Sequence, residues 1–297
     1  MGIWVDTDLG FDDLWALLML RRYGVTVDGV SLTAGNTPME RVLRNAAGAV
    51  MAFDLPWPLF QGASAPLARP LITAEPVLTN RGMRTRGHHL PDAGMPDVVP
   101  AGDGIVPWLT SGSAAKTVLA LGPLTTIAHL ARHHPDAYRR IDHLVWMGGA
   151  SARGNQTPFA EFNAHADAHA FARVAASGVR FSIVDLAACR QATFGESDIP
   201  ADLAPLVRDL LGGYLDIALT RGRAHMAIYD PLAALAITHP DCLTFSPRGV
   251  TIVTDVGEAH GQTLFGPADD ASTVMLATGV CAGAVAHCLD GLRKSTP

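Results

Sequence analysis

The sequence has few basic residues and no run of them. Lysine and arginine together number 22 against 28 aspartates and glutamates, so the formal net charge is −6. Proteins that bind DNA, RNA or an anionic membrane through charge need extended basic surfaces. We therefore expect neither nucleic acid nor a membrane as a partner.

Cysteine is also scarce, with four residues in 297, and the spacing fits neither a CxxC pair nor a zinc site. A chain of this length can bury a large apolar core and has no need of disulfide staples. Cys189, Cys242, Cys281 and Cys288 are therefore predicted to be reduced, mostly buried thiols.

Signals for export or membrane insertion are missing as well. Residues 3–5 lead directly into an acidic cluster, without the basic start and apolar stretch of a signal peptide. The one long apolar tract, residues 273–289, is rich in Ala, Gly, Cys and Val and contains His287, which favours a core helix over a membrane span. The predicted location is the cytoplasm.

Short β-rich runs alternate with longer helical patterns along the whole chain. The predicted strands cover residues 3–5, 27–33, 117–121, 143–147, 179–184 and 250–253. The predicted helices cover residues 13–23, 41–53, 124–133, 164–177 and 232–237. This alternation predicts a single α/β domain over residues 1–297, with an open, mostly parallel sheet and helices on both faces. Residues 55–104, rich in Pro, Gly and Arg, are interpreted as a long excursion over the active-site edge.

Four aspartates crowd the turn after the first predicted strand, namely Asp6, Asp8, Asp12 and Asp13. In open α/β sheets, ligands bind in the crevice outside the carboxyl ends of the strands. Carboxylates so close together repel one another in a crevice, and a bound hard cation with oxygen ligands relieves that repulsion. The alternative is a solvated Asp-rich turn in which one carboxylate caps the following helix.

Two later segments carry further polar groups. Asp230 precedes Pro231 and a Leu/Ala run, which by itself is typical of a helix N-cap followed by Pro in the first helical position. Residues 155–163 place several amides and a carboxylate ahead of a predicted helix. By itself this segment fits Asn163 as a helix cap with Glu161 in solvent.

Residues 6–13 resemble the N-terminal signature of the inosine–uridine nucleoside hydrolase family, Asp-Thr-Asp-Pro-Gly-x-Asp-Asp, with Leu9 where Pro is common. Later segments resemble the family in the family's order, namely residues 35–36, 122–125, 147–150, 154–163 and 230–233. The resemblance spans nearly the whole chain. It implies a nucleoside hydrolase-like fold, hydrolysis of the N-glycosidic bond of ribonucleosides, Ca²⁺ as cofactor, and a homo-oligomer, either a dimer or a tetramer.

The resemblance also implies roles for individual residues. The calcium ligands would be Asp8, Asp13, Asp230 and the Leu121 carbonyl. The substrate-binding residues would be Asp12, Asn36, Met147, Asn155, Glu161, Phe162 and Asn163. Among these, Asn155 and Glu161 would hold the ribose 5′-hydroxyl. The 2′ and 3′ hydroxyls would be held by Asn163, Asn36 and Asp12. Met147 would line the ribose, although plain core packing fits this residue equally well.

The expected mechanism follows from the charge that develops during the reaction. Departure of the base makes the ribose oxocarbenium-like, and a pocket lined by carboxylates stabilises that positive charge. Asp8 is the predicted general base, taking a proton from a calcium-activated water that attacks the anomeric carbon.

One position departs from the family pattern. Many members have a histidine directly before the metal-binding aspartate, proposed to protonate the leaving base, whereas this chain has Tyr229. A phenol can donate a proton but is a poorer acid than imidazole at neutral pH. Tyr229 is therefore the candidate acid, with His88, His89 and His225 as alternatives.

Two other functions fit parts of the sequence. Asp6-x-Asp8 after the first strand also resembles the nucleophile motif of haloacid dehalogenase-type phosphatases, which would make the chain a metal-dependent phosphohydrolase. The only lysines, Lys116 and Lys294, lack the acidic pair that such enzymes need. A non-catalytic nucleoside-binding homologue would instead keep the metal and ribose ligands and lack the leaving-group acid.

Overall fold

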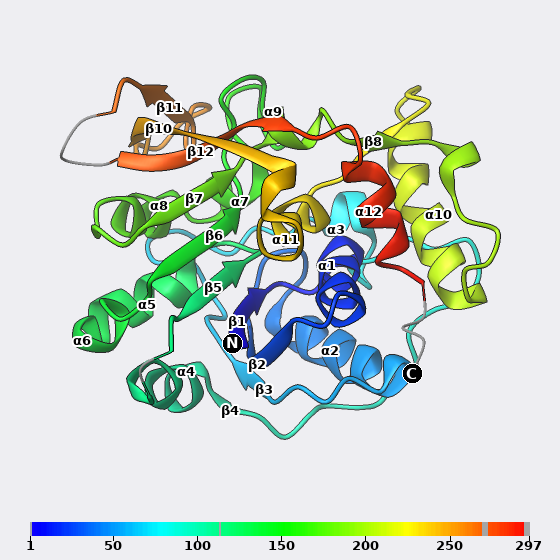
Figure 1. Ribbon diagram of the computed structural model, residues 1–297, viewed down its shortest axis with the longest axis horizontal. Helices are drawn as coiled ribbons and strands as arrows, with labels where there is room; N and C mark the ends of the chain where they lie inside the picture. Colours follow the sequence, from blue (N-terminus) through cyan, green and yellow to red (C-terminus); the bar gives the residue numbers. More distant parts are fainter. Residues whose placement is uncertain (1, 113, 269–272, 294–297) are drawn as a thin grey trace.

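The computed structural model describes residues 2–112, 114–268 and 273–293, and its centre is a ten-stranded sheet (Figure 1). The strands of this sheet are β1 (Gly2–Thr7), β2 (Thr26–Leu32), β3 (Leu59–Gln61), β4 (Val99–Pro100), β5 (Thr117–Ala120), β6 (His143–Met147), β7 (Phe181–Val184), β10 (Leu243–Ile252), β11 (Thr263–Gly266) and β12 (Thr273–Val280). Two short strands, β8 (Thr193–Phe194) and β9 (Met226–Ala227), pair separately.

The longer helices are α1 (Phe11–Arg22), α2 (Met39–Phe53), α4 (Ala101–Thr110), α5 (Thr125–His133), α8 (Ala168–Ala175), α10 (Pro205–Leu219), α11 (Asp230–Thr238) and α12 (Ala284–Asp290). The shorter ones are α3 (Glu75–Leu78), α6 (Pro135–Tyr138), α7 (Phe162–Ala166), α9 (Leu186–Cys189) and the 3₁₀ helices η1 (Glu196–Asp198) and η2 (Pro240–Cys242). No helix within the described ranges combines the length and the apolar character needed to cross a membrane.

The strand order in the sheet is β11-β10-β12-β7-β6-β5-β1-β2-β3-β4. Every neighbouring pair is parallel except β10, which runs antiparallel to both β11 and β12. The chain leaves β1 toward β2, β3 and β4 and then returns to the other side of β1 through β5. That reversal places a crevice at the carboxyl end of β1, where ligands bind in folds of this kind.

Strand residues alternate between two apolar cores, one on each face of the sheet. In β1, Ile3 and Val5 pack with α1, α2, α10 and α11, whereas Trp4 packs with α4 and α5 on the other face. The helices lie on both sides of the sheet (Figure 1). The predicted open, mostly parallel sheet covered on both faces is confirmed, and the apolar strands follow from burial on both sides.

The predicted helix over residues 164–177 is instead two helices, α7 and α8, with Asp167 between them. Asp167 leaves the helical conformation, with φ −146° and ψ 76°, and its Oδ1 accepts a hydrogen bond from the Ala170 N–H at 3.0 Å. Its Oδ2 accepts bonds from the Leu67 N–H and Thr125 Oγ1. These tertiary partners outweigh the local helical pattern and make Asp167 the N-cap of α8.

The apolar tract at residues 273–289 is also divided differently from the prediction. Its first part is β12 and its second part is α12, so a single core helix is wrong. β12 pairs with β7 on one side and β10 on the other. An apolar run buried on both sides of a sheet cannot be told from a buried helix by composition alone.

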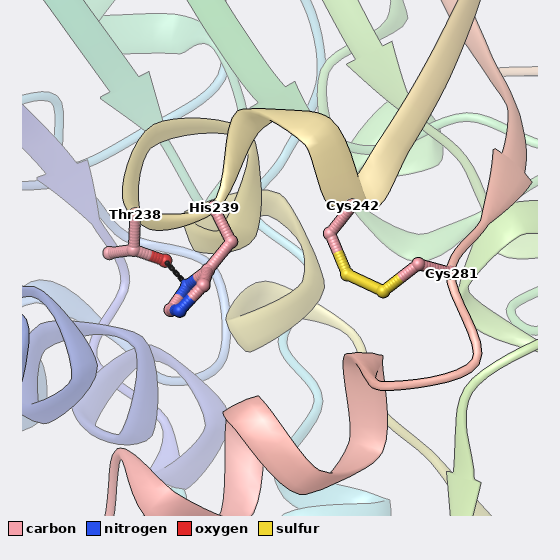
Figure 2. The surroundings of a disulfide bond; sticks show 4 residues. All are labelled: Thr238, His239, Cys242 and Cys281. Atoms are coloured by element: carbon pink, nitrogen blue, oxygen red, sulfur yellow. Dashed lines mark hydrogen bonds between the residues drawn. A yellow bond between two sulfur atoms is a disulfide. The ribbon is translucent and has the colours of Figure 1, made fainter.

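Two of the four cysteines form a disulfide, contrary to the prediction for them. Cys242, at the end of η2, is bonded to Cys281, just after β12, with 4.8 Å between the two Cα atoms (Figure 2). The pairing of Leu243 with Val280 brings the two cysteines opposite each other. Cys189 and Cys288 are buried free thiols, as predicted.

Candidate active site

An acidic turn joins β1 to α1 at the carboxyl end of the sheet. β1 ends at Thr7 and α1 begins at Phe11, so Asp8 lies in the turn while Asp12 and Asp13 lie in the first helical turn. Asp8 is 2% exposed and Asp13 is 0% exposed. Buried carboxylates are costly unless their charge is compensated, so their partners determine what this turn can do.

Asp13 is held by the backbone and side chains of the turn itself. Its Oδ1 accepts a hydrogen bond from Thr7 Oγ1, and its Oδ2 accepts one from the Gly10 N–H at 2.8 Å. Leu9 adopts a φ of 42°, in the left-handed region that residues other than glycine seldom occupy. A proline ring holds φ near about −65°, so the usual family proline could not adopt this turn conformation.

Asp8 is held by the segment that follows β2. The Asn36 backbone N–H donates to Asp8 Oδ2 at 2.7 Å, and Asn36 Nδ2 donates to Asp8 Oδ1 at 3.1 Å. Two glycines leave room for this carboxylate, because a Cβ at Gly35 would lie 2.1 Å from Asp8 Oδ2 and one at Gly122 would lie 3.1 Å from Asp8 Cβ. The segments after β1, β2 and β5 therefore meet around Asp8.

Asp6 faces away from this group, although it precedes it in the same acidic run. It is fully buried, and its Oδ1 accepts a hydrogen bond from Ser31 Oγ. Burial raises the pKa of Asp6 to about 7, against hydrogen bonds from Ser31 and Thr126 that lower it. Asp6 therefore belongs to the packing beneath the turn.

Asp230 approaches the acidic turn from α11, which packs against α1. The N-cap position of α11 belongs to Tyr229, which makes no side-chain capping hydrogen bond, so the interpretation of Asp230 as an N-cap is wrong. One carboxylate oxygen from each of Asp12, Asp13 and Asp230 lies within 4.8 Å of the other two.

Burial raises the pKa of all four acids, and the charge of Asp13 opposes the ionisation of the other three. Burial raises the pKa of Asp8 well above its usual range, and the charge of Asp13 raises it further. Burial and the charge of Asp13 also raise the pKa of Asp12 to about 7. The pKa of Asp230 is raised well above its usual range by burial and by the charges of Asp13 and Asp12. Burial raises the pKa of Asp13 as well, although hydrogen bonds from Thr7 and Gly10 counteract it.

The residues present fit a hard divalent cation. Carboxylate oxygens with excess negative charge are the donors that such an ion prefers, and a cation among them would remove the repulsion that raises their pKa values. The resemblance implies Asp8, Asp13 and Asp230 as carboxylate ligands. The three carboxylates that lie within 4.8 Å of one another are Asp12, Asp13 and Asp230. The two sets therefore share Asp13 and Asp230 and differ in Asp8 and Asp12. Asp8 adjoins this group through its interaction with Asp13.

Asn163 is oriented by two backbone carbonyls. Its Nδ2 donates to the Leu121 oxygen at 2.8 Å and to the Met147 oxygen at 3.0 Å. No group in the described part of the chain donates to Asn163 Oδ1, which can therefore accept a hydrogen bond from a ligand. Asn163 does not cap a helix, so that interpretation is wrong.

Glu161 is the N-cap of α7 and is 2% exposed, not solvated. Its Oε1 accepts a hydrogen bond from the Asn163 N–H, and its Oε2 accepts bonds from the N–H groups of Ala164 and Gly149. Burial raises the pKa of Glu161 to about 7, although these three hydrogen bonds lower it. Because a carboxylate offers about four acceptor sites, Glu161 can still accept a ligand hydroxyl.

These side chains line one cavity of about 210 Å³. Its lining includes every predicted substrate-binding residue, together with Asp8, Leu121, Tyr229 and Asp230. Within it, Asn155 Oδ1 accepts a hydrogen bond from the Phe162 N–H at 2.9 Å, which leaves the amide nitrogen of Asn155 for a ligand. Further apolar lining comes from other elements and includes Pro76, Val77, Leu78, Ile217 and Met226. The predicted excursion over residues 55–104 reaches the site through Thr73–Leu78.

A sequence profile described as "Inosine-uridine preferring nucleoside hydrolase" matches residues 3–286. The chain belongs to this family. A relative described as "Non-specific ribonucleoside hydrolase RihC", from Salmonella agona (strain SL483), is 32% identical over 271 residues, covering 89% of this chain and 87% of the relative. The protein of the same description from Salmonella schwarzengrund (strain CVM19633) is 33% identical over 272 residues, with the same coverage.

Solved nucleoside hydrolase structures share the fold. A plant nucleoside hydrolase, the PpNRh1 enzyme, has a TM-score of 0.88 at 22% identity, and 98% of each chain is covered. A purine-preferring ribonucleoside hydrolase from Gardnerella vaginalis has a TM-score of 0.88 at 21% identity, again with 98% of each chain covered. The predicted nucleoside hydrolase-like fold is therefore confirmed. Membership of this family makes the protein an enzyme. The family match favours a nucleoside hydrolase over the phosphohydrolase and the non-catalytic binding protein considered from the sequence.

Sequence reasoning missed the part of this nucleoside hydrolase's cavity that comes from α10 and the residues just after it. Tyr214, which is 3% exposed, donates a hydrogen bond to Asp12 Oδ2 at 3.2 Å. Arg221 is the only lysine, arginine or histidine among the described residues that line the cavity. Tyr214 and Ile217 are three residues apart on one face of α10, and Arg221 lies two residues after the end of that helix. The spacing of these residues by three and four was the available signal.

The four candidates for the leaving-group acid differ in whether they line the cavity. Tyr229 lines the cavity and packs edge-on against Tyr214, with 6.4 Å between ring centroids. Burial raises the pKa of Tyr229 to about 12. The histidines at positions 88, 89 and 225 do not line this cavity. His88 pairs with Asp209 at 2.6 Å, and His89 lines a different cavity.

Proposed function

We propose that this enzyme hydrolyses the N-glycosidic bond of ribonucleosides to give ribose and free base, with Asp8 as general base. We propose Ca²⁺ as the ion, held by Asp8, Asp13, Asp230 and the Leu121 carbonyl. The homo-oligomeric state and the cytoplasmic location stay predictions from the resemblance and the sequence. The observation that carries the proposal is the single cavity in which buried acids and amides meet an apolar lining from α3, α10 and β9.

The geometry of Asp8 suits a general base. Burial and neighbouring charges raise its pKa, which makes the carboxylate a stronger proton acceptor. The backbone N–H and Nδ2 of Asn36 fix its direction, so it can meet a water at a defined position. A bound Ca²⁺ supplies the positive charge that keeps these acids ionised and makes a nearby water more acidic.

The ribose would be oriented by groups that are already fixed. The Oδ1 of Asn163 and the carboxylate of Asp12 would accept hydrogen bonds from the 2′ and 3′ hydroxyls. The carboxylate of Glu161 would accept one from the 5′-hydroxyl, and the Asn155 amide would donate one to it. Buried negative charge around the sugar stabilises its oxocarbenium character as the base leaves. Rigid placement of the ribose lowers the entropic cost of the attack.

The base would lie against the apolar lining, where few side chains could read its edge. The name of the Salmonella relatives, non-specific ribonucleoside hydrolase, supports a broad range of bases. The test is release of free base from purine and pyrimidine ribonucleosides, measured alongside phosphate release from phosphate esters. Phosphate release without base release would contradict the proposal.

Glu161 is expected to control recognition of the 5′-hydroxyl. The wild-type enzyme should turn over 5′-deoxynucleosides much more slowly than the parent nucleosides, because the hydrogen bond from the 5′-hydroxyl to the buried carboxylate is then lost. In Glu161→Ala the ratio of kcat/KM for the two substrates should fall close to one. The ratio is taken within each variant, so a partial loss of folded protein from removing the N-cap cancels.

Glu161→Gln serves as the matched variant for this experiment. It keeps the shape and one acceptor oxygen for the α7 N–H groups, so it should retain part of the 5′ discrimination. A ratio in Glu161→Ala that equals the wild-type ratio would show that Glu161 is not the 5′ contact.

Tyr229 is expected to matter most for nucleosides whose base needs a proton to leave. If its phenol donates that proton, Tyr229→Phe should slow natural nucleosides by roughly 10²–10⁴-fold, the usual worth of general acid catalysis. A nitrophenyl riboside should be much less affected, because its leaving group departs as a stable anion. The comparison requires kcat/KM for both substrates in both proteins.

Equal losses for the two substrates would contradict the acid role and assign Tyr229 to binding. The raised pKa of the phenol favours that outcome over full acid catalysis. Arg221 would then be the group to examine, since its cationic side chain lines the same cavity and could stabilise an anionic leaving base.

A further inference from the structure

A second cavity, of about 240 Å³, lies between α2 and the segment that follows α3. It is separate from the active-site cavity and similar to it in size. Its basic lining residues are Arg41, Arg44, Arg81 and His89. Asp92 is the one acidic residue among the described residues that line it. The chain as a whole carries a net negative charge, whereas the lining of this cavity carries a net positive charge.

Two of its three arginines have no partner for their charge. Arg44 is paired, with Glu40 at 3.3 Å and with Asp92 at 3.5 Å. Neither Arg41 nor Arg81 forms an ion pair with any residue that the structure describes. Two arginines without a carboxylate partner at one cavity leave positive charge that a bound anion would neutralise. The cavity therefore has the charge to hold an anion with two negative charges.

Two asparagines complete the polar lining. Asn45 and Asn80 both line this cavity. Asn45 is 8% exposed, and its Nδ2 donates to the backbone oxygen of Arg81 at 2.8 Å, which holds the Arg81 segment against α2. Guanidinium forks are the groups that recognise phosphate oxygens with paired hydrogen bonds in proteins.

We propose that this cavity binds a phosphomonoester, with Arg41 and Arg81 on the phosphate. A phosphate ester carries close to two negative charges at neutral pH, which matches the two unpaired guanidiniums, whereas a carboxylate would leave one of them unpaired. The cavity is at least as large as the one that receives a nucleoside under the proposed function. It has room for a phosphorylated sugar as well as for inorganic phosphate.

The site is connected to the active-site cavity by one short segment. Five residues between positions 73 and 78 line the active-site cavity, and Asn80 and Arg81 line the second one. Asn45 Nδ2 also lies 3.5 Å from the backbone oxygen of Leu9, in the acidic turn. A phosphomonoester on Arg81 would therefore fix the segment that contacts the nucleoside. The bound ester is expected to change KM for the nucleoside more than kcat.

The test is isothermal titration calorimetry of the metal-free full chain at low ionic strength, with inorganic phosphate and with ribose 5-phosphate as probes. Arg41→Gln and Arg81→Gln should each weaken binding about tenfold or more, the usual effect of losing a hydrogen bond to a charged group. Arg248→Gln, at an exposed arginine of β10, is the matched control and should bind like wild type. Arg81→Lys, which keeps the charge, should retain part of the affinity.

The two probes separate the two sources of phosphate. Equal affinity would assign the site to free phosphate, and tighter binding of ribose 5-phosphate would assign it to a phosphorylated sugar. Absence of binding at millimolar probe, or binding that neither Gln substitution weakens, would overturn the proposal. Binding is measured without turnover, so this result is independent of the proposed function. Only the expected change in KM rests on nucleoside hydrolysis.

Discussion

Asp8→Asn and Asp13→Asn should each lower kcat/KM for ribonucleosides by roughly 10²–10⁴-fold or more, with the fold intact. Asp8→Asn removes the proposed general base, a group whose loss usually costs that much. Asp13→Asn removes one of the carboxylates that lie within 4.8 Å of one another and is expected to weaken ion binding. Both substitutions also relieve repulsion among buried acids, so the variants should melt no lower than wild type without metal.

Asp103→Asn, at an exposed carboxylate in the first turn of α4, is the control for loss of one negative charge. Calcium affinity should be measured in the same variants and in Asp12→Asn. If Asp12 is a ligand, its substitution should weaken calcium binding as much as that of Asp13. Activity within a few-fold of wild type in Asp8→Asn or Asp13→Asn would remove the basis for the proposed site.

Removal of calcium should abolish turnover and lower the melting temperature, because the ion binds only the folded protein. The size of the stabilisation should depend on pH. The folded pKa of Asp12 is raised to about 7, and those of Asp8 and Asp230 are raised well above their usual range. Without metal, the stability that comes from protonating these acids is full below the unfolded pKa near 4 and is lost as pH rises through about 7.

Calcium should therefore raise the melting temperature more at pH 8 than at pH 5.5, because at low pH protons already neutralise the acids. Differential scanning fluorimetry with chelator and with added calcium, at both pH values, measures this difference. A melting temperature that responds to calcium at neither pH would contradict the proposed ion.

The architecture, and the place of the candidate site within it, followed from sequence patterns that depend on local chemistry. Apolar strands alternating with helices predict a parallel sheet, and in such a sheet the polar segments that follow neighbouring strands must lie together. Asp8, Asn36 and Leu121 follow β1, β2 and β5, and these strands are neighbours in the sheet. The glycines beside Asp8 are needed because a side chain at Gly35 would collide with its carboxylate.

What the sequence did not show depends on contacts between distant segments. The disulfide needs β10 and β12 to pair in one particular register. The spacing of Cys242 and Cys281 in the sequence does not indicate that register. Asp167 interrupts a helical pattern because Leu67 and Thr125 bind its carboxylate. Such partners cannot be identified from local propensity.

The prediction for the N-cap of α7 was also wrong. The sequence pattern suggested Asn163 as the cap, yet Glu161 accepts the hydrogen bonds from the helix N-terminus. Asn163 is instead directed by the carbonyls of Leu121 and Met147, which come from two different strand ends. Tyr214 was missed for a similar reason, because its hydrogen bond to Asp12 joins α10 to α1 across the core.

The most direct test of the central claim is base release from inosine and uridine by one preparation of the enzyme, measured with calcium and with chelator. We expect free base and ribose in equal amounts when calcium is present, and no release above background when it is chelated. Release that continues unchanged in chelator would contradict the role of the metal. No base release from any ribonucleoside with calcium present would contradict the proposed function itself.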